Sequence, residues 1–157
     1  MQQFCCAGLN FGYFYTGSPI IVPDGEHLPP AYSMGAFTAS TVPGCRAPHF
    51  WLADGRSLYD AFGPGYTLLR FDRSADVRAL ERAADAYRMP LTVLDIDAAV
   101  VPPAYAHRLV LCRADQHVAW RGAYVPADVY ELVARLRGEP QRERAAKRAL
   151  PWEGVLA

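Results

Sequence analysis

The order of apolar segments between residues 66 and 138 constrains the fold of this chain more than any other feature of its sequence. Residues 66–71 form a compact apolar run typical of a buried strand, and residues 91–97 form a second one. Between them, residues 77–87 carry apolar side chains at the spacing of one helix face, and Ser74 is a candidate cap for that helix. This stretch therefore predicts a β-α-β unit with a right-handed crossover.

A hairpin and a second helix are expected to follow. Residues 108–113 and 117–121 are short apolar segments on either side of a polar turn, and residues 126–138 place an apolar stripe on a helix that Gly138 ends. The complete order, β-α-β, β-hairpin and α, is that of the thioredoxin fold. We therefore predict an α/β, thioredoxin-like domain with an irregular N-terminal arm and a charged C-terminal tail, over residues 49–138, 1–48 and 139–157 respectively.

Charge and hydropathy exclude several classes of partner. Sixteen Lys and Arg residues balance sixteen Asp and Glu residues, so the net charge is zero and no basic surface favours nucleic acid. No apolar run approaches the roughly 18 to 20 residues that a membrane span needs. The N-terminus also lacks the positively charged and long apolar regions of a signal peptide. We predict a cytoplasmic protein that binds neither nucleic acid nor membrane.

The expected thiol chemistry of the fold is missing from its usual position. Redox-active thioredoxins carry Cys-x-x-Cys between the first strand and its helix, but residues 71–76 contain no cysteine. Among the four cysteines of the chain, Cys45 lies near Arg46 and His49 in the sequence and is the candidate reactive thiol. The adjacent pair Cys5-Cys6 falls on the arm, away from any helix start.

No other catalytic or ligand-binding motif is present in the sequence. The four histidines are isolated and lack the i, i+4 spacing of a helical metal site. The chain has no nucleophile elbow, no phosphate-binding glycine loop and no dinucleotide fingerprint. We therefore predict no catalytic, cofactor-binding or metal-binding residue in this chain.

Several segments, taken in order, resemble the C-terminal region of FAD-dependent aromatic-ring hydroxylases of the phenol 2-monooxygenase and 2,4-dichlorophenol hydroxylase type. They are residues 9–15 with 18–21, 43–49, 54–60 and 118–122. In that family a large flavin-binding and substrate-binding part is followed by a thioredoxin-like domain without active cysteines. Full-length members use NAD(P)H to reduce FAD, form a flavin hydroperoxide with O2 and hydroxylate a phenolic ring. This chain lacks the family's GxGxxG and Gly-Asp flavin motifs, and residues 54–57 are interpreted as a turn.

The resemblance implies a redox-inactive C-terminal module with a structural or association role and no bound cofactor. Its expected partner is a flavin-binding domain or separate chain that carries FAD and uses NAD(P)H, and the arm residues Phe11, Tyr13 and Tyr15 are the candidate interface. Without that partner, the arm is expected to pair two copies as a homodimer. Two alternatives stay open: a divergent thiol oxidoreductase that uses Cys45 or Cys5-Cys6, and a stand-alone binding module that uses an exposed Trp51 or Trp120.

Overall fold

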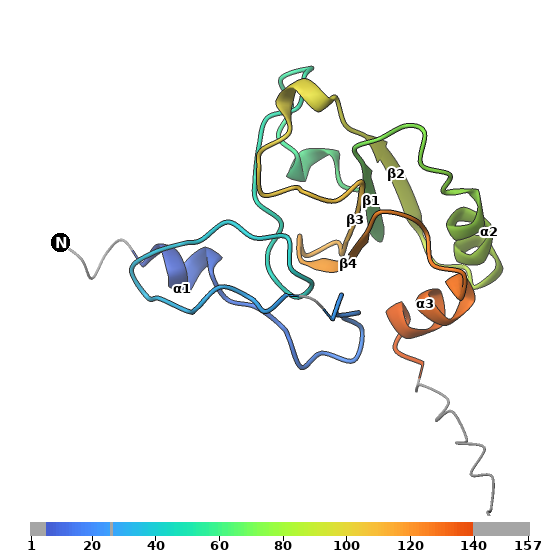
Figure 1. The fold of residues 1–157 in the computed structure, drawn as a ribbon, viewed down its shortest axis with the longest axis horizontal. Helices are drawn as coiled ribbons and strands as arrows, with labels where there is room; N and C mark the ends of the chain where they lie inside the picture. The colour runs from blue at the N-terminus through green and yellow to red at the C-terminus, as the bar shows by residue number, and fades with distance from the viewer. Residues whose placement is uncertain (1–5, 26, 140–157) are drawn as a thin grey trace, which may run out of the picture.

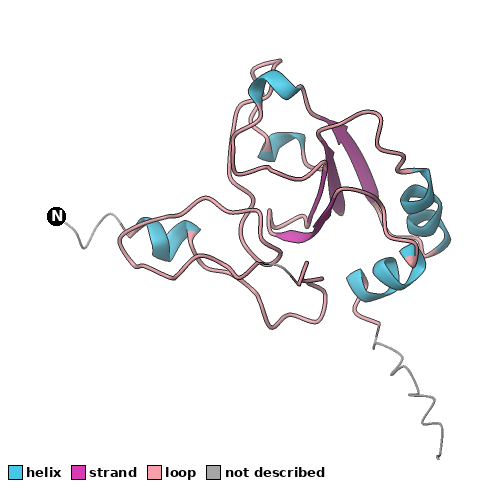
Figure 2. Ribbon diagram, viewed as in Figure 1, coloured by secondary structure: helices cyan, strands magenta, loops and turns pink. Residues whose placement is uncertain are grey.

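One mixed sheet of four strands organises the part of the chain that the computed structural model describes, residues 6–25 and 27–139 (Figures 1 and 2). The strands lie in the order β2-β1-β3-β4, and their bounds are Tyr66–Arg70 (β1), Leu91–Asp95 (β2), Leu109–Cys112 (β3) and Val118–Gly122 (β4). Strand β1 is parallel to β2, whereas β3 is antiparallel to both β1 and β4. This topology confirms the predicted thioredoxin-like α/β fold.

Two helices, α2 (Arg78–Ala86) and α3 (Val129–Leu136), lie together on one side of the sheet (Figure 1). The predicted start of the first helix at Ser74 is wrong. The backbone N–H of Ser74 donates to the Asp72 carboxylate at 2.8 Å, and that of Arg78 donates to the Asp76 carboxylate at 3.0 Å. These local side-chain bonds hold the backbone in turns, so the helix begins at Arg78, three residues later than a cap at Ser74 implies.

The sheet is covered on both faces by separate apolar clusters. Leu68 and Leu69 are neighbours in β1 and both are fully buried, but Leu68 packs toward α2 and α3 while Leu69 packs on the opposite side. On that second side lie residues 47–62, with the short helix η2 (Tyr59–Ala61), and the segment around η3 (Ala98–Val100). Burial of both faces explains why the strands appear in the sequence as continuous apolar runs without alternation.

The N-terminal arm begins with a short helix, α1 (Ala7–Phe11), that projects away from the sheet (Figure 1). Residues 9–11 therefore lie in a helix. Gly8 accounts for the close packing of this helix, because a Cβ atom there would lie 1.6 Å from the carbonyl oxygen of Ser33. Past α1, Phe14 forms an isolated antiparallel bridge with Cys45.

Two stretches of the arm pack directly against β4. The backbone N–H of Val22 donates to the carbonyl of Ala119 at 2.8 Å, and that of Gly44 donates to Val118 at 2.7 Å. Ile21 is 2% exposed and belongs to the same apolar cluster as α2 and α3. The arm is therefore joined to the folded core at residues 21–22 and 41–48, whereas most of its residues between 22 and 41 are exposed or half-buried. Its first residues and the tail lie outside the described residues, except Glu139 of that tail.

Candidate functional site

The edge of the sheet where redox-active thioredoxins hold their thiols carries an ion-paired network in this protein. Arg108, which directly precedes β3, donates from Nε to the Asp72 carboxylate at 2.9 Å and from Nη2 to the Ser74 hydroxyl at 2.8 Å. Hydrogen bonds from Ser74, together with Arg108, hold the pKa of Asp72 below its usual range. The carboxylate therefore stays charged at neutral pH, with the Arg108 guanidinium on its Oδ2 atom and the Ser74 backbone N–H on its Oδ1 atom. This arrangement contains no thiol, so it cannot carry out thiol–disulfide exchange.

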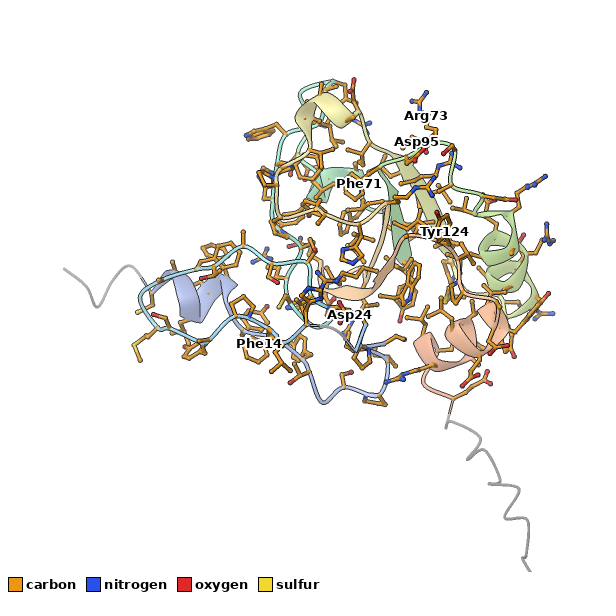
Figure 3. All side chains as sticks on the ribbon, in the orientation of Figure 1. Phe14, Asp24, Phe71, Arg73, Asp95 and Tyr124 are labelled. Atoms are coloured by element: carbon orange, nitrogen blue, oxygen red, sulfur yellow. The ribbon has the colours of Figure 1, made fainter. Side chains whose placement is uncertain are left out.

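A second ion pair lies beside the first, across the ends of β1 and β2. Arg70 donates to the two carboxylate oxygens of Asp95 at 2.6 and 3.0 Å, and Arg73 lies 3.7 Å from the same carboxylate (Figure 3). The hydrogen bonds from Arg70 lower the pKa of Asp95. The edge is thus a closed set of paired charges, which is suited to structure and unsuited to acid–base catalysis near neutral pH.

The candidate thiol Cys45 is buried, with 7% of its surface exposed. Its backbone pairs on both sides, since Cys45 N–H donates to Val42 and its carbonyl accepts from Val118, each at 2.9 Å. Burial is the main cause of a raised pKa for this thiol, although Ser40 and Arg121 act in the opposite direction. A raised pKa disfavours the thiolate, which is the reactive form.

Among the cysteines that the structure describes, none forms a redox pair with Cys45. Cys112 is fully buried in β3, and burial raises its pKa far above the ordinary value. Neither Cys45 nor Cys112 is in a disulfide. Cys6 precedes α1 and is half-buried, whereas Cys5 lies outside the described residues, so the proposed Cys5-Cys6 pair has no described geometry.

We expect Cys45 to react slowly with a thiol reagent. In the native protein, Cys45→Ser and the wild type should release the same amount of chromophore in the fast phase with Ellman's reagent, because the buried thiol does not contribute to it. In urea the wild type should then gain one equivalent over the variant. Loss of one equivalent from the native fast phase of Cys45→Ser would show that this thiol is accessible and reactive.

The arm residues predicted as an interface are partly exposed and rest on the domain. Tyr13 and Tyr15 are 40% and 42% exposed, and their ring centroids lie 5.1 and 4.7 Å from that of His117. Phe11 is 47% exposed and lies under the guanidinium of Arg46, 5.3 Å from its ring centroid. Each ring thus uses one side to hold the arm and leaves another side to solvent. Whether a partner contacts them stays a prediction.

His117 is a residue that the sequence pattern does not distinguish from the other histidines. It is 1% exposed, lies between the arm and the β3–β4 turn, and its Nδ1 is 3.0 Å from the Asp115 carbonyl oxygen. Its Nε2 is buried without a hydrogen-bond partner. Burial lowers the pKa of this imidazole, with Asp115 acting in the opposite direction. The residues that bury it, Tyr13 and Tyr15, are far from it in the sequence, so no local pattern predicts its burial.

The two tryptophans proposed for a binding surface differ in burial. Trp120 is 8% exposed and belongs to the cluster under α2 and α3, so its use as an exposed surface is wrong. Trp51 is 65% exposed at a tight hairpin, where it bridges Ser57 and where Leu52 N–H donates to Arg56 at 2.9 Å. Gly55, with φ of 82°, takes the left-handed conformation in that hairpin, which confirms the predicted turn over residues 54–57.

Two further kinds of site are missing from the part of the chain that the structure describes. Within residues 6–25 and 27–139, no three His, Cys, Asp or Glu side chains come together in a way that could hold a metal ion. Over the same residues, every helix is too short or too polar to cross a membrane.

Comparison with known proteins decides the family. Residues 40–140 match the family model described as "Aromatic-ring hydroxylase, C-terminal". The chain belongs to this family. The resemblance inferred from the sequence is thereby confirmed, and the match begins at residue 40, within the stretch of the arm that pairs with β4.

Individual relatives agree with the family model. The FAD-dependent monooxygenase apdD of Emericella nidulans is 35% identical over 123 residues, which are 73% of this chain and 20% of that protein. Phenol 2-monooxygenase of a Pseudomonas species is 29% identical over 144 residues, which are 80% of this chain and 24% of that protein. The solved structure of the rebeccamycin biosynthetic enzyme RebC with reduced flavin matches with a TM-score of 0.73 and 35% identity, over 88% of this chain and 25% of that chain.

The chain therefore corresponds to the C-terminal domain of much longer proteins. It spans about a fifth to a quarter of the length of these relatives. Two of them are named for FAD or contain a flavin. Their activity belongs to the whole proteins, of which the domain described above is a minor part.

Proposed function

We propose that this chain acts as a redox-inactive structural module that associates with the flavin-binding part of an aromatic-ring monooxygenase. The network of Asp72, Ser74 and Arg108 carries this proposal, because it fills the position of the redox thiols with charges that are already paired. The association with a flavin-binding part is supported by the relatives, because this chain covers only 20% and 24% of their length and leaves the rest for FAD-dependent chemistry.

The module is proposed to bind no FAD and no NAD(P)H when alone. The described residues contain no glycine-rich phosphate loop at a strand-to-helix junction, and the β1–α2 junction carries Asp72 and Asp76, which disfavour a phosphate group. Purified chain should show no flavin absorbance, no phenol-stimulated NADPH oxidation and no reduction of insulin disulfides. Flavin that stays bound through dialysis against a flavin-free buffer, phenol-stimulated NADPH oxidation by the dialysed chain, or insulin reduction that is lost in Cys45→Ser would each contradict the proposal.

The association role is tested by a graft. We expect apdD from which the matching segment has been removed to retain less FAD than intact apdD, and we expect this chain, supplied in trans or fused at the same point, to restore retention. Equal retention with and without the chain would contradict an association role.

A thiol oxidoreductase is the weaker alternative. Its candidate thiol, Cys45, is buried and has a raised pKa. The cytoplasmic location expected from the sequence stays a prediction.

A homodimer is the second form of association that we propose for the isolated chain. Large apolar side chains of the arm are exposed, among them Leu28 at 90%, Met34 at 62% and Leu9 at 57%. Exposed apolar groups of this size favour association. Sedimentation equilibrium of the isolated chain should therefore show a concentration-dependent dimer, and a monomer at all concentrations would contradict it.

A further inference from the structure

A continuous row of rings and one guanidinium crosses the surface from the arm to the hairpin at Trp51. We call it the aromatic row, and its members in order are Phe37, Phe11, Arg46, Tyr59, His49 and Trp51. We propose that the aromatic row is the surface on which the flavin-binding part of an aromatic-ring hydroxylase docks. This inference rests on the proposed association role and names its contact surface.

Neighbouring members of the row contact each other at regular distances. The ring centroids of Phe11 and Phe37 are 6.3 Å apart, and the Arg46 guanidinium lies 5.3 Å from the ring of Phe11 and 5.1 Å from that of Tyr59. The ring of His49 lies 5.2 Å from that of Tyr59 and 5.1 Å from that of Trp51. The row thus joins two segments of the chain, the arm and residues 46–59, into one surface.

The centre of the row is held in place by hydrogen bonds to the domain. Arg46 donates from Nε to the Gln116 side chain at 3.1 Å, and the Tyr59 hydroxyl donates to the Ala47 carbonyl at 2.6 Å. The His49 Nε2 atom lies 3.0 Å from the Ser57 hydroxyl. Side chains fixed before binding lose less conformational entropy when a partner arrives.

Three large apolar members of the row are exposed. Trp51 is 65% exposed, Phe11 47% and Phe37 39%, so large apolar surfaces remain in water although the middle of the row is rigid. Trp, Tyr and Arg are the residue types that contribute most to binding at protein interfaces. The row combines all three at its centre and at the hairpin end. It therefore has the composition of an interface rather than that of ordinary surface.

The position of the row along the chain favours the flavin-binding part as its occupant. The matching family model is named for the C-terminal domain, and the relatives are four to five times as long as the segment that matches. The rest of such an enzyme therefore precedes this domain. Because α1 is the first described helix and carries Phe11, a part that precedes it in the chain arrives next to the row.

The experiment uses the full chain and, as probe, apdD truncated before its matching segment. Binding is measured by calorimetry for the wild type, Trp51→Ala, Phe11→Ala and the control Tyr130→Ala. Tyr130 is 53% exposed on α3, outside the row. We expect the Kd to rise at least tenfold for Trp51→Ala and for Phe11→Ala and to change less than twofold for Tyr130→Ala. Circular dichroism and urea midpoints show that each variant is folded.

The outcomes separate this inference from the association role itself. If the wild type binds and both row variants bind equally well, the row is overturned while the association role stands. If the wild type does not bind and a fused chimera with apdD loses its FAD, both are overturned. If instead the wild type forms a dimer that Trp51→Ala abolishes and no binding to the probe is seen, the occupant is a second copy and this assignment is wrong.

Discussion

Asp24→Ala is expected to lower the free energy of unfolding by about 3 to 5 kcal/mol. The Asp24 and Arg121 side chains are 9% and 6% exposed, and Arg121 donates from Nε to the Asp24 carboxylate at 2.8 Å (Figure 3). Arg121 also donates to the Thr41 hydroxyl at 3.1 Å. Without the carboxylate, a guanidinium stays buried with one neutral partner, which is the costly situation for a buried charge. Urea denaturation measures the loss.

Two controls isolate the buried pair. Glu139→Ala removes one partner of the ion pair with Arg137, whose side chains are 45% and 40% exposed, so the urea midpoint should hardly change. The double variant Asp24→Leu with Arg121→Met replaces both charges with apolar groups and should recover much of the stability lost in the single variant. If Asp24→Ala unfolds at the same urea concentration as the wild type, the arm is not part of the cooperative fold.

The dominant fold was predictable because its signal is local. Strands, helices and the hairpin between residues 66 and 138 each follow from apolar spacing within a few residues, and the order of these elements then leaves few topologies. The start of α2 was missed for an equally local reason. Asp72 and Asp76 accept backbone hydrogen bonds from residues two positions later, and this turn chemistry competes with a cap at Ser74.

The packing of the arm was not predictable from local pattern. Val22 pairs with Ala119, and Asp24 pairs with Arg121 at a separation of 97 residues, so no window of the sequence contains both partners. The segment looks irregular because its hydrogen bonds go to a strand formed much later in the chain. The same distance hides the burial of His117, whose neighbours Tyr13 and Tyr15 precede it by about a hundred residues.

The candidate site shows a similar division. The absence of cysteine from residues 71–76 was visible in the sequence and directed the function toward a module without thiol chemistry. The sequence did not show which residues occupy that edge, because Arg108 lies 36 residues after Asp72 and 34 after Ser74. The exposure of Trp51 and the burial of Trp120 likewise depend on neighbours brought together by the fold. The sequence shows that the redox cysteines are missing, and the structure shows that paired charges stand at their position.

The stability of the domain is expected to decrease as pH falls below about 6.5, the ordinary pKa of histidine. Burial lowers the pKa of His117 in the folded protein, so below that pH the unfolded chain binds a proton that the folded protein does not. The contribution of His117 to the free energy of unfolding therefore decreases with falling pH, by at most about 1.4 kcal/mol per pH unit for one proton, and this contribution stops changing below the folded pKa. A protonated His117 would lie among Tyr13, Tyr15 and the positively charged Arg113. Asp115 is the nearest group that could compensate its charge.

Urea denaturation at pH 7.5, 6.5 and 5.5 tests this expectation by difference. In His117→Phe an aromatic ring stays against Tyr13 and Tyr15 but cannot be protonated, so the variant should lose less stability than the wild type between pH 7.5 and 5.5. His49→Gln is the control, because it removes an exposed imidazole that forms no ion pair among the residues that the structure describes, and this variant should lose as much stability as the wild type between pH 7.5 and 5.5. Equal losses for the wild type and His117→Phe would show that the buried imidazole accepts a proton without disturbing the arm, and the arm would then not depend on a neutral His117.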